Sequence, residues 1–295
     1  MLSKVLITTL ALCSFMFGAE CTERYGKGSL EIKLATGSPG ELGLVKVLAE
    51  EFAKSNDITL CWIKAGSGES LSLLKNKDVD IIMVHAPKGE KEAVKEGWAS
   101  DRSLIGSNEF YITGPKNDPA LIKDSTSVVE AYSRIAAKKA LFYTRADNSG
   151  THKKELEIWK KANISPEGNW YTINKDFMLA TLKKADTTGA YFMTDSSTWV
   201  AAKKKLKNQS ILFRGDIFLV NTYNALKQNG LDTPQKNISS KFIDFVAKGE
   251  GQNIIRSFGK ELYGEAIYND RVCAGAANEY LSLAVVVQGY GMMCT

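Results

Sequence analysis

The sequence predicts an α/β protein with two α/β lobes, which are joined by two extended crossover strands and enclose a ligand cleft. Short apolar segments alternate with amphipathic segments in both halves of the chain. Two long extended stretches, residues 103–120 and 210–226, bracket the middle segment, as expected if the chain crosses into a second lobe and returns. A length of 295 residues is sufficient for two separate cores.

The segment before the first crossover is expected to alternate strands with helices. Its clearest helix lies in residues 43–55, where apolar side chains recur at helical spacing. Strands are expected to begin at Leu30, Ile58 and Val79, and the first two run into Gly-Ser turns. This order predicts a parallel sheet that is covered by helices.

The same alternation returns in the middle segment and is followed by helices near the end. The expected elements are a strand at 138–144, a helix from Thr151, a strand at 189–194, a helix at 196–206, and helices at 239–259 that finish near Tyr263.

The crossovers divide the chain into a discontinuous first lobe and a continuous second lobe. The first lobe is expected to contain residues 28–112 and 216–268, and the second lobe residues 113–215. Residues 269–295 form a C-terminal extension, in which 280–291 have the composition of a strand, and no function is assigned to it.

Residues 1–19 are typical of a secretory signal peptide. Lys4 provides the positive end, and the apolar core Val5–Gly18 is shorter than a membrane-spanning helix requires. Cleavage is expected after Ala19, with a buried N-terminal helix as the alternative. A lipid anchor on Cys21 fits poorly because Glu20 precedes it. The mature protein is therefore expected to be exported.

The charge balance favours a small anionic ligand over nucleic acid. Loss of Lys4 with the signal peptide lowers the net charge from +5 to +4, which is a mild excess. The lysines are spread along the chain apart from Lys203–Lys205, which reads as a solvated helix face, so no nucleic-acid partner is expected. A modest positive field suits the capture of a small anion.

Four cysteines remain after cleavage, and an even number in an exported chain permits two disulfides. Pairing between neighbours in sequence, Cys21 with Cys61 and Cys273 with Cys294, is one of three possible connectivities. The spacing of the cysteines does not match a zinc or redox motif.

Three strand-to-helix turns share a composition of glycine and hydroxyl residues, at 35–41, 65–70 and 144–155. Such turns gather at the carboxyl ends of the strands, where helix N-termini receive anions well. Each turn alone could be an ordinary helix cap. Three together, with Arg145 beside the last, indicate an anion pocket, because a guanidinium can bond an oxyanion at two points. A simple salt bridge between Arg145 and Asp147 is the alternative.

Asp147 has two possible roles in such a pocket. It could hold Arg145 in position, or it could accept a proton from a protonated oxyanion such as hydrogen phosphate. We expect the positioning role.

Catalysis is not indicated by the residues. His85 and His152 fall on different expected elements, and Gly66–Ser70 has the wrong spacing for a nucleophile elbow. We find no Walker motif and no convincing pair of carboxylates. The sequence therefore predicts no enzyme, no cofactor and no protein-bound metal, with an exported hydrolase using His152 and a pocket serine as a distant alternative.

The chain resembles the periplasmic tungstate-binding proteins of ABC transporters, which are related to molybdate- and phosphate-binding proteins. The similarity covers roughly residues 30–268 and is carried by the segments 79–97, 101–120, 142–162, 169–185, 189–199 and 214–226. It implies a type II periplasmic binding protein fold that closes over one tetrahedral oxyanion, with tungsten held as the oxyanion.

The resemblance also implies a set of ligand-binding residues. These are Thr36 and Ser38 in the first turn, Ser67 and Gly68 in the second, and Arg145, Ser149, Gly150 and Thr151 in the third. Independently of the resemblance, Asp147 and Thr144 are expected to support these residues without contacting the ligand. The first turn departs from the family's run of threonines, because Ala35 and Gly37 remove hydroxyl groups there.

The function implied is capture of tungstate and delivery to the permease of an ABC importer in the inner membrane, by a protein expected to be monomeric. Molybdate or phosphate remain alternative ligands, and the sequence does not rank tungstate against molybdate.

Overall fold

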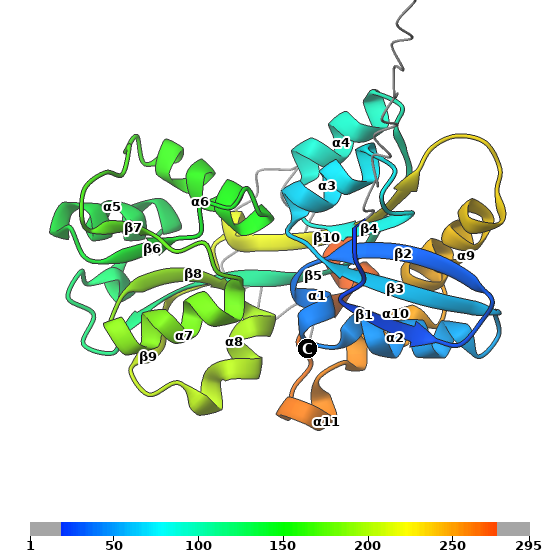
Figure 1. Ribbon diagram of the computed structural model, residues 1–295. Helices are drawn as coiled ribbons and strands as arrows, with labels where there is room; N and C mark the ends of the chain where they lie inside the picture. The colour runs from blue at the N-terminus through cyan, green and yellow to red at the C-terminus, as the bar shows by residue number, and fades with distance from the viewer. Residues whose placement is uncertain (1–18, 276–295) are drawn as a thin grey trace, which may run out of the picture.

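The computed structural model describes residues 19–275, and Figure 1 shows two α/β lobes side by side with strands β5 and β10 near their junction. The expected signal peptide and the strand expected at 280–291 lie outside the described residues, apart from Ala19. In the described part of the chain, no helix has the length and apolar character needed to cross a membrane.

The first lobe has a mixed sheet with the strand order β1-β3-β2-β4-β10-β5. Its strands are β1 (Glu23–Gly26), β2 (Leu30–Thr36), β3 (Ile58–Lys64), β4 (Ile81–Val84), β10 (Val220–Gln228) and the first part of β5 (Ala99–Pro115). Strands β2, β3 and β4 are parallel, as expected, whereas β1 and β10 run antiparallel to their neighbours. The short β11 (Asn269–Asp270) pairs with β5.

Helices cover this sheet because each has one apolar face. They are α1 (Ser38–Glu41), α2 (Leu44–Ala53), α3 (Ser67–Lys75), α4 (Pro87–Lys95), α9 (Pro234–Lys248), α10 (Gly251–Ser257) and α11 (Lys260–Tyr263). Leu48 and Phe52 of α2 pack with Phe242 of α9 against Ile32 and Leu34 of the sheet.

The second lobe has the strand order β5-β8-β6-β7, with β9 also paired to β5. Its elements are η1 (Ile122–Asp124), α5 (Val128–Lys138), β6 (Phe142–Thr144), α6 (Gly150–Lys161), β7 (Tyr171–Ile173), α7 (Met178–Thr188), β8 (Tyr191–Asp195), α8 (Ser196–Ala202), η2 (Lys203–Lys205) and β9 (Gln209–Phe213). Its core contains the contacting rings of Tyr132, Phe142 and Trp159.

Strand β5 passes from one sheet to the other without a break. It pairs with β10 as far as Glu109 and with β8 from Phe110 onward. The return is different: residues 210–226, expected as one extended stretch, are divided into β9, the 3-10 turn η3 (Ile217–Leu219) and β10. Gly215 has φ of 85°, and the Asp216 carboxylate accepts a hydrogen bond from Phe218 N at 2.9 Å, so these two residues turn the chain.

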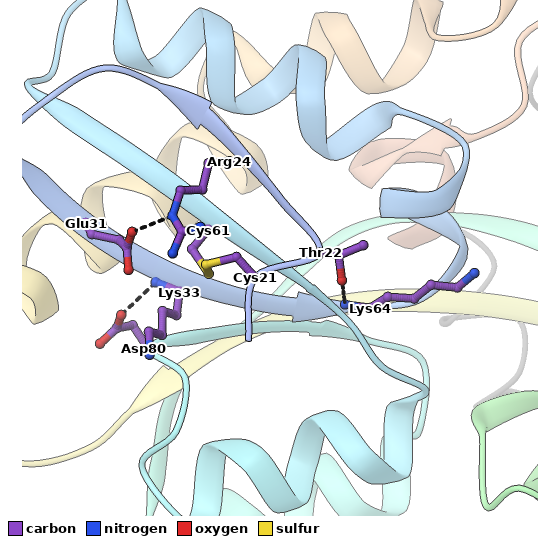
Figure 2. Close-up of a disulfide and its surroundings, with 8 residues drawn as sticks. All are labelled: Cys21, Thr22, Arg24, Glu31, Lys33, Cys61, Lys64 and Asp80. Carbon is purple, nitrogen blue, oxygen red and sulfur yellow. Dashed lines mark hydrogen bonds and ion pairs between the residues drawn. A yellow bond between two sulfur atoms is a disulfide. The ribbon is translucent and has the colours of Figure 1, made fainter. Parts of the chain in front are cut away.

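The predicted disulfide between Cys21 and Cys61 is present (Figure 2). It ties the N-terminal segment to β3, close to Thr22, whose hydroxyl accepts a hydrogen bond from Lys64 N at 2.9 Å. On the neighbouring strand β2, Lys33 N donates a hydrogen bond to the carboxylate of Asp80, which lies just before β4, at 2.8 Å. The second predicted pair includes Cys294, which lies outside the described residues.

Candidate functional site

A small cavity lies between the lobes where several helices begin. Helices α1 and α3 of the first lobe and α6 and α7 of the second place their first residues around it. The lining residues are Thr36, Gly37, Ser38, Pro39, Gly66, Ser67, Met83, His85, Arg145, Ser149, Thr151, Phe177, Met178, Asp195 and Tyr223. Since helix N-termini carry partial positive charge and unpaired N–H groups, this arrangement favours an anion.

The first lobe contributes two serines and a threonine, which differ in whether their hydroxyl hydrogens are free to bond a ligand. Ser67 is buried, and its hydroxyl accepts a hydrogen bond from His85 N at 3.3 Å, which leaves its own hydrogen free to be donated. Ser38 opens α1 and lines the cavity. Thr36 lines it too, but its hydroxyl donates to the carbonyl of Met83 at 2.7 Å. Its hydrogen is therefore already used within the protein.

The second lobe contributes the start of α6. Ser149 is the N-cap, and its hydroxyl accepts a hydrogen bond from His152 N at 3.2 Å. Thr151 is 2% exposed, and its Oγ1 has no hydrogen-bond partner within residues 19–275. A buried hydroxyl without a partner is costly, so this atom is available to a ligand.

Arg145 follows β6 and is 5% exposed. Its Nη2 pairs with Asp147 Oδ2 at 2.5 Å, whereas its Nε is buried without a partner among the described residues. Asp147 also accepts a hydrogen bond from Ser149 N through Oδ1 at 3.1 Å. The salt bridge considered from sequence is therefore formed, and it still leaves a donor of Arg145 for a ligand.

The turn between Arg145 and Ser149 has an unusual backbone. Ala146 and Asn148 both have positive φ, 48° and 58°, a conformation that is unfavourable for alanine. The two bonds of Asp147 span this turn and hold it. His152 supports it as well, because its Nδ1 accepts a hydrogen bond from Asn148 N at 3.1 Å.

Four of the predicted residues do not line the cavity. Thr144 is buried at the end of β6, and Asp147 lies behind Arg145. Gly68 and Gly150 lie where the lobes touch, against Asn148 and His85 respectively. The six other predicted residues, Thr36, Ser38, Ser67, Arg145, Ser149 and Thr151, are brought together as lining residues.

Sequence reasoning missed the wall formed by the start of α7. Phe177 is the N-cap of this helix, and its ring lies 4.1 Å from Lys64 Nζ and 5.5 Å from the guanidinium carbon of Arg145. The apolar residues that recur at helical spacing after Phe177 predict a helix there, but the segment lacks the Gly-Ser composition that pointed to a ligand in the other turns.

The remaining lining residues add little charge. Asp195 caps α8 and accepts hydrogen bonds from Thr198 N and Thr198 Oγ1, each at 2.8 Å, so its carboxylate is already satisfied. Burial lowers the pKa of His85 to about 4, which leaves the ring neutral at neutral pH. Arg145 thus gives the cavity its positive charge.

A closed cavity between two lobes, lined by helix N-termini, hydroxyl groups and a guanidinium group, defines a solute-binding protein for a small anion. The PBP superfamily domain matches residues 22–250. The chain belongs to the PBP superfamily and, within it, to the same family as the tungstate-binding proteins named TupA.

The relatives support this assignment over most of the chain. The tungstate-binding protein TupA of Peptoclostridium acidaminophilum is 32% identical over 84% of this chain and 88% of its own length. The structure of the tungstate ABC transporter from Geobacter sulfurreducens is 37% identical, with a TM-score of 0.70 over 78% of this chain and all of the other. TupA from Desulfovibrio alaskensis G20 is 35% identical, with a TM-score of 0.67 over 82% of this chain and 99% of the other. The predicted fold class and family resemblance are confirmed.

Proposed function

We propose that this protein captures tungstate as a tetrahedral oxyanion and delivers it to an ABC importer. The observation that carries the proposal is the pair of buried, unpartnered donors, Arg145 Nε and Thr151 Oγ1, beside a cavity enclosed by the two lobes. Relatives named for tungstate binding support the choice of ion.

The donors available around the cavity are sufficient in number for tight binding. Nanomolar affinity corresponds to about 12 kcal/mol, and hydrogen bonds to a charged group contribute about 1.5–3 kcal/mol each. Some six to eight donors would therefore suffice after the costs of association. Arg145, Ser38, Ser67, Ser149 and Thr151 supply side-chain donors, and the first N–H groups of α3, α6 and α7 supply the rest.

In this proposal Asp147 positions the guanidinium and does not act as a proton acceptor. Both of its oxygens accept hydrogen bonds from the protein, one from Arg145 and one from Ser149 N. An unprotonated dianion such as tungstate needs no proton acceptor in the site, which agrees with this use of Asp147.

We also propose that the protein works in the periplasm as a monomer, as a binding protein and not as a catalyst, and that lobe closure is what the permease of the importer recognises. The Cys21–Cys61 disulfide supports an oxidising location. His152 is the residue that the alternative hydrolase hypothesis would use for catalysis. Its ring instead accepts a hydrogen bond from Asn148 N, which supports a structural role.

Calorimetry on the purified protein with tungstate, molybdate, phosphate and sulfate tests the proposal. We expect tight binding of tungstate, comparable or weaker binding of molybdate, and much weaker binding of phosphate and sulfate. Tight binding of phosphate without any heat from tungstate would contradict the proposal.

A further inference from the structure

The two lobes touch beside the cavity through backbone and ring atoms. We call the four residues of this contact, Gly68, His85, Asn148 and Gly150, the lobe seam. A Cβ atom placed on Gly150 would lie 2.5 Å from Nδ1 and 2.8 Å from Nε2 of His85. A Cβ atom on Gly68 would lie 2.5 Å from the carbonyl oxygen of Asn148 and 2.7 Å from its Nδ2. Each pair joins one residue from each lobe.

His85 packs against its own lobe and against the strand β5 that joins the two lobes. Its backbone N–H donates to Ser67 Oγ, and its ring lies 4.9 Å from the ring of Tyr223 and 5.9 Å from that of Phe110. Tyr223 lies in β10, which pairs with the first part of β5, whereas Phe110 lies where β5 begins to pair with β8 of the second lobe. The imidazole is therefore packed against rings of two strands, which limits its freedom to move aside when the other lobe approaches.

On the opposite side, Gly150 is the first residue of α6, between the lining residues Ser149 and Thr151. The position of this helix start relative to the first lobe thus determines where the donors of the second lobe stand. His85 itself lines the cavity next to Ser67. The ring of His85 thus lies at one point of contact between the two sets of donors. Gly66, next to Ser67, marks another, because a Cβ atom on Gly66 would lie 3.3 Å from Ser149 Cβ.

We infer that His85 is a specificity-determining residue, whose ring against Gly150 limits lobe closure and so sets the size of the oxyanion that both lobes can contact. The inference rests on the proposed function. Tungstate and molybdate have longer metal–oxygen bonds than the corresponding bonds of sulfate. An ion that is too small would leave donors of one lobe unpaired, because the stop at His85 prevents the lobes from following it.

The neutral state of the ring agrees with this role. Burial holds the pKa of His85 near 4, so at neutral pH the residue contributes shape and not charge. Its Nδ1 has no hydrogen-bond partner within the described residues, which makes direct donation to the ligand the competing explanation.

Calorimetry with tungstate and sulfate on the full chain distinguishes these explanations. We expect His85→Ala to reduce the preference for tungstate over sulfate at least tenfold. His85→Phe keeps a flat ring but removes both nitrogens, and we expect it to stay within threefold of the wild-type preference. If His85→Phe loses as much preference as His85→Ala, the ring acts as a donor and the inference is wrong. Circular dichroism and thermal unfolding establish that each variant is folded.

A second pair of variants tests the seam from the other lobe. We expect Gly150→Ala to weaken tungstate binding at least tenfold, because the added methyl group would collide with His85 on closure. Gly275→Ala is the control, since a Cβ there meets no atom of residues 19–275 within 4 Å, and it should bind as the wild type does. Wild-type affinity in Gly150→Ala would overturn the inference while leaving tungstate binding itself intact. Absence of oxyanion binding in the wild type would instead overturn the proposed function.

Discussion

Replacing Arg145 with alanine should weaken tungstate binding by at least an order of magnitude. The guanidinium has one nitrogen engaged with Asp147 and a buried Nε without a partner among residues 19–275, so at least one charge-assisted hydrogen bond to the ligand is lost. Such a bond contributes about 1.5–3 kcal/mol, which corresponds to about a 10- to 150-fold change in affinity. The loss should be larger because the carboxylate of Asp147, without its guanidinium partner, would then repel a bound anion.

Calorimetric titration with tungstate measures this effect directly. Arg145→Lys keeps the charge but loses the planar donor geometry, and its affinity should fall between those of the wild type and Arg145→Ala. Arg24→Ala is the matched control, because it removes the same charge from a side chain that is 58% exposed and paired on the surface with Glu31. It should bind within about threefold of the wild type. Affinity of Arg145→Ala within that same range would refute the central role of Arg145.

Three further predictions use paired changes in the same protein. Thr151→Val should weaken tungstate binding about tenfold without loss of stability, because the buried hydroxyl has no partner among the described residues. Thr36→Val should instead lower the melting temperature and leave the affinity nearly unchanged, because its hydroxyl bonds the carbonyl of Met83. The reverse pattern would contradict these roles of the two hydroxyl groups. Burial raises the pKa of Glu155 from 4.5 to about 7, so its contribution to stability is full below pH 4.5 and lost as the pH rises through about 7. The difference in melting temperature between wild type and Glu155→Gln should change across that window, and a constant difference would refute the shift. Removing the disulfide with Cys21→Ser should lower the free energy of unfolding, measured by urea denaturation, by about 2–4 kcal/mol and leave the tungstate affinity unchanged. Equal stability of Cys21→Ser and the wild type would contradict this prediction.

Much of the fold follows from local pattern. The alternation of apolar strands and amphipathic helices predicts β2, β3 and β4 with their helices, because hydrophobic periodicity decides which face each element buries. The break at Gly215 and Asp216 escaped the same reasoning. There, Gly215 and Asp216 interrupt an apolar stretch whose composition otherwise favours a single strand. The turn is needed because β9 and β10 pair with different parts of β5.

The site was predictable to the extent that its residues share a composition. Arg145 and the hydroxyl residues of three turns could be found because each turn ends a strand and begins a helix. Phe177 and His85 could not, since an aromatic N-cap and a ring after an apolar strand have ordinary structural uses. The distinction between Thr36 and Thr151 was also beyond the sequence, because it depends on one carbonyl of a neighbouring strand, that of Met83.

The buried donors explain why a ligand would drive closure. With the lobes closed and the cavity empty, Arg145 Nε and Thr151 Oγ1 would be cut off from water without partners, at a cost of about 1–3 kcal/mol for each neutral group and more for a charged one. Opening the lobes would let water bind both groups, so under the proposed function we expect the open state to be favoured until an oxyanion arrives. The anion then binds the closed state far more tightly than the open one, and this difference in affinity shifts the population. The same groups that recognise the ion thus make closure depend on it, while the contact between His85 and Gly150 limits how far closure can go.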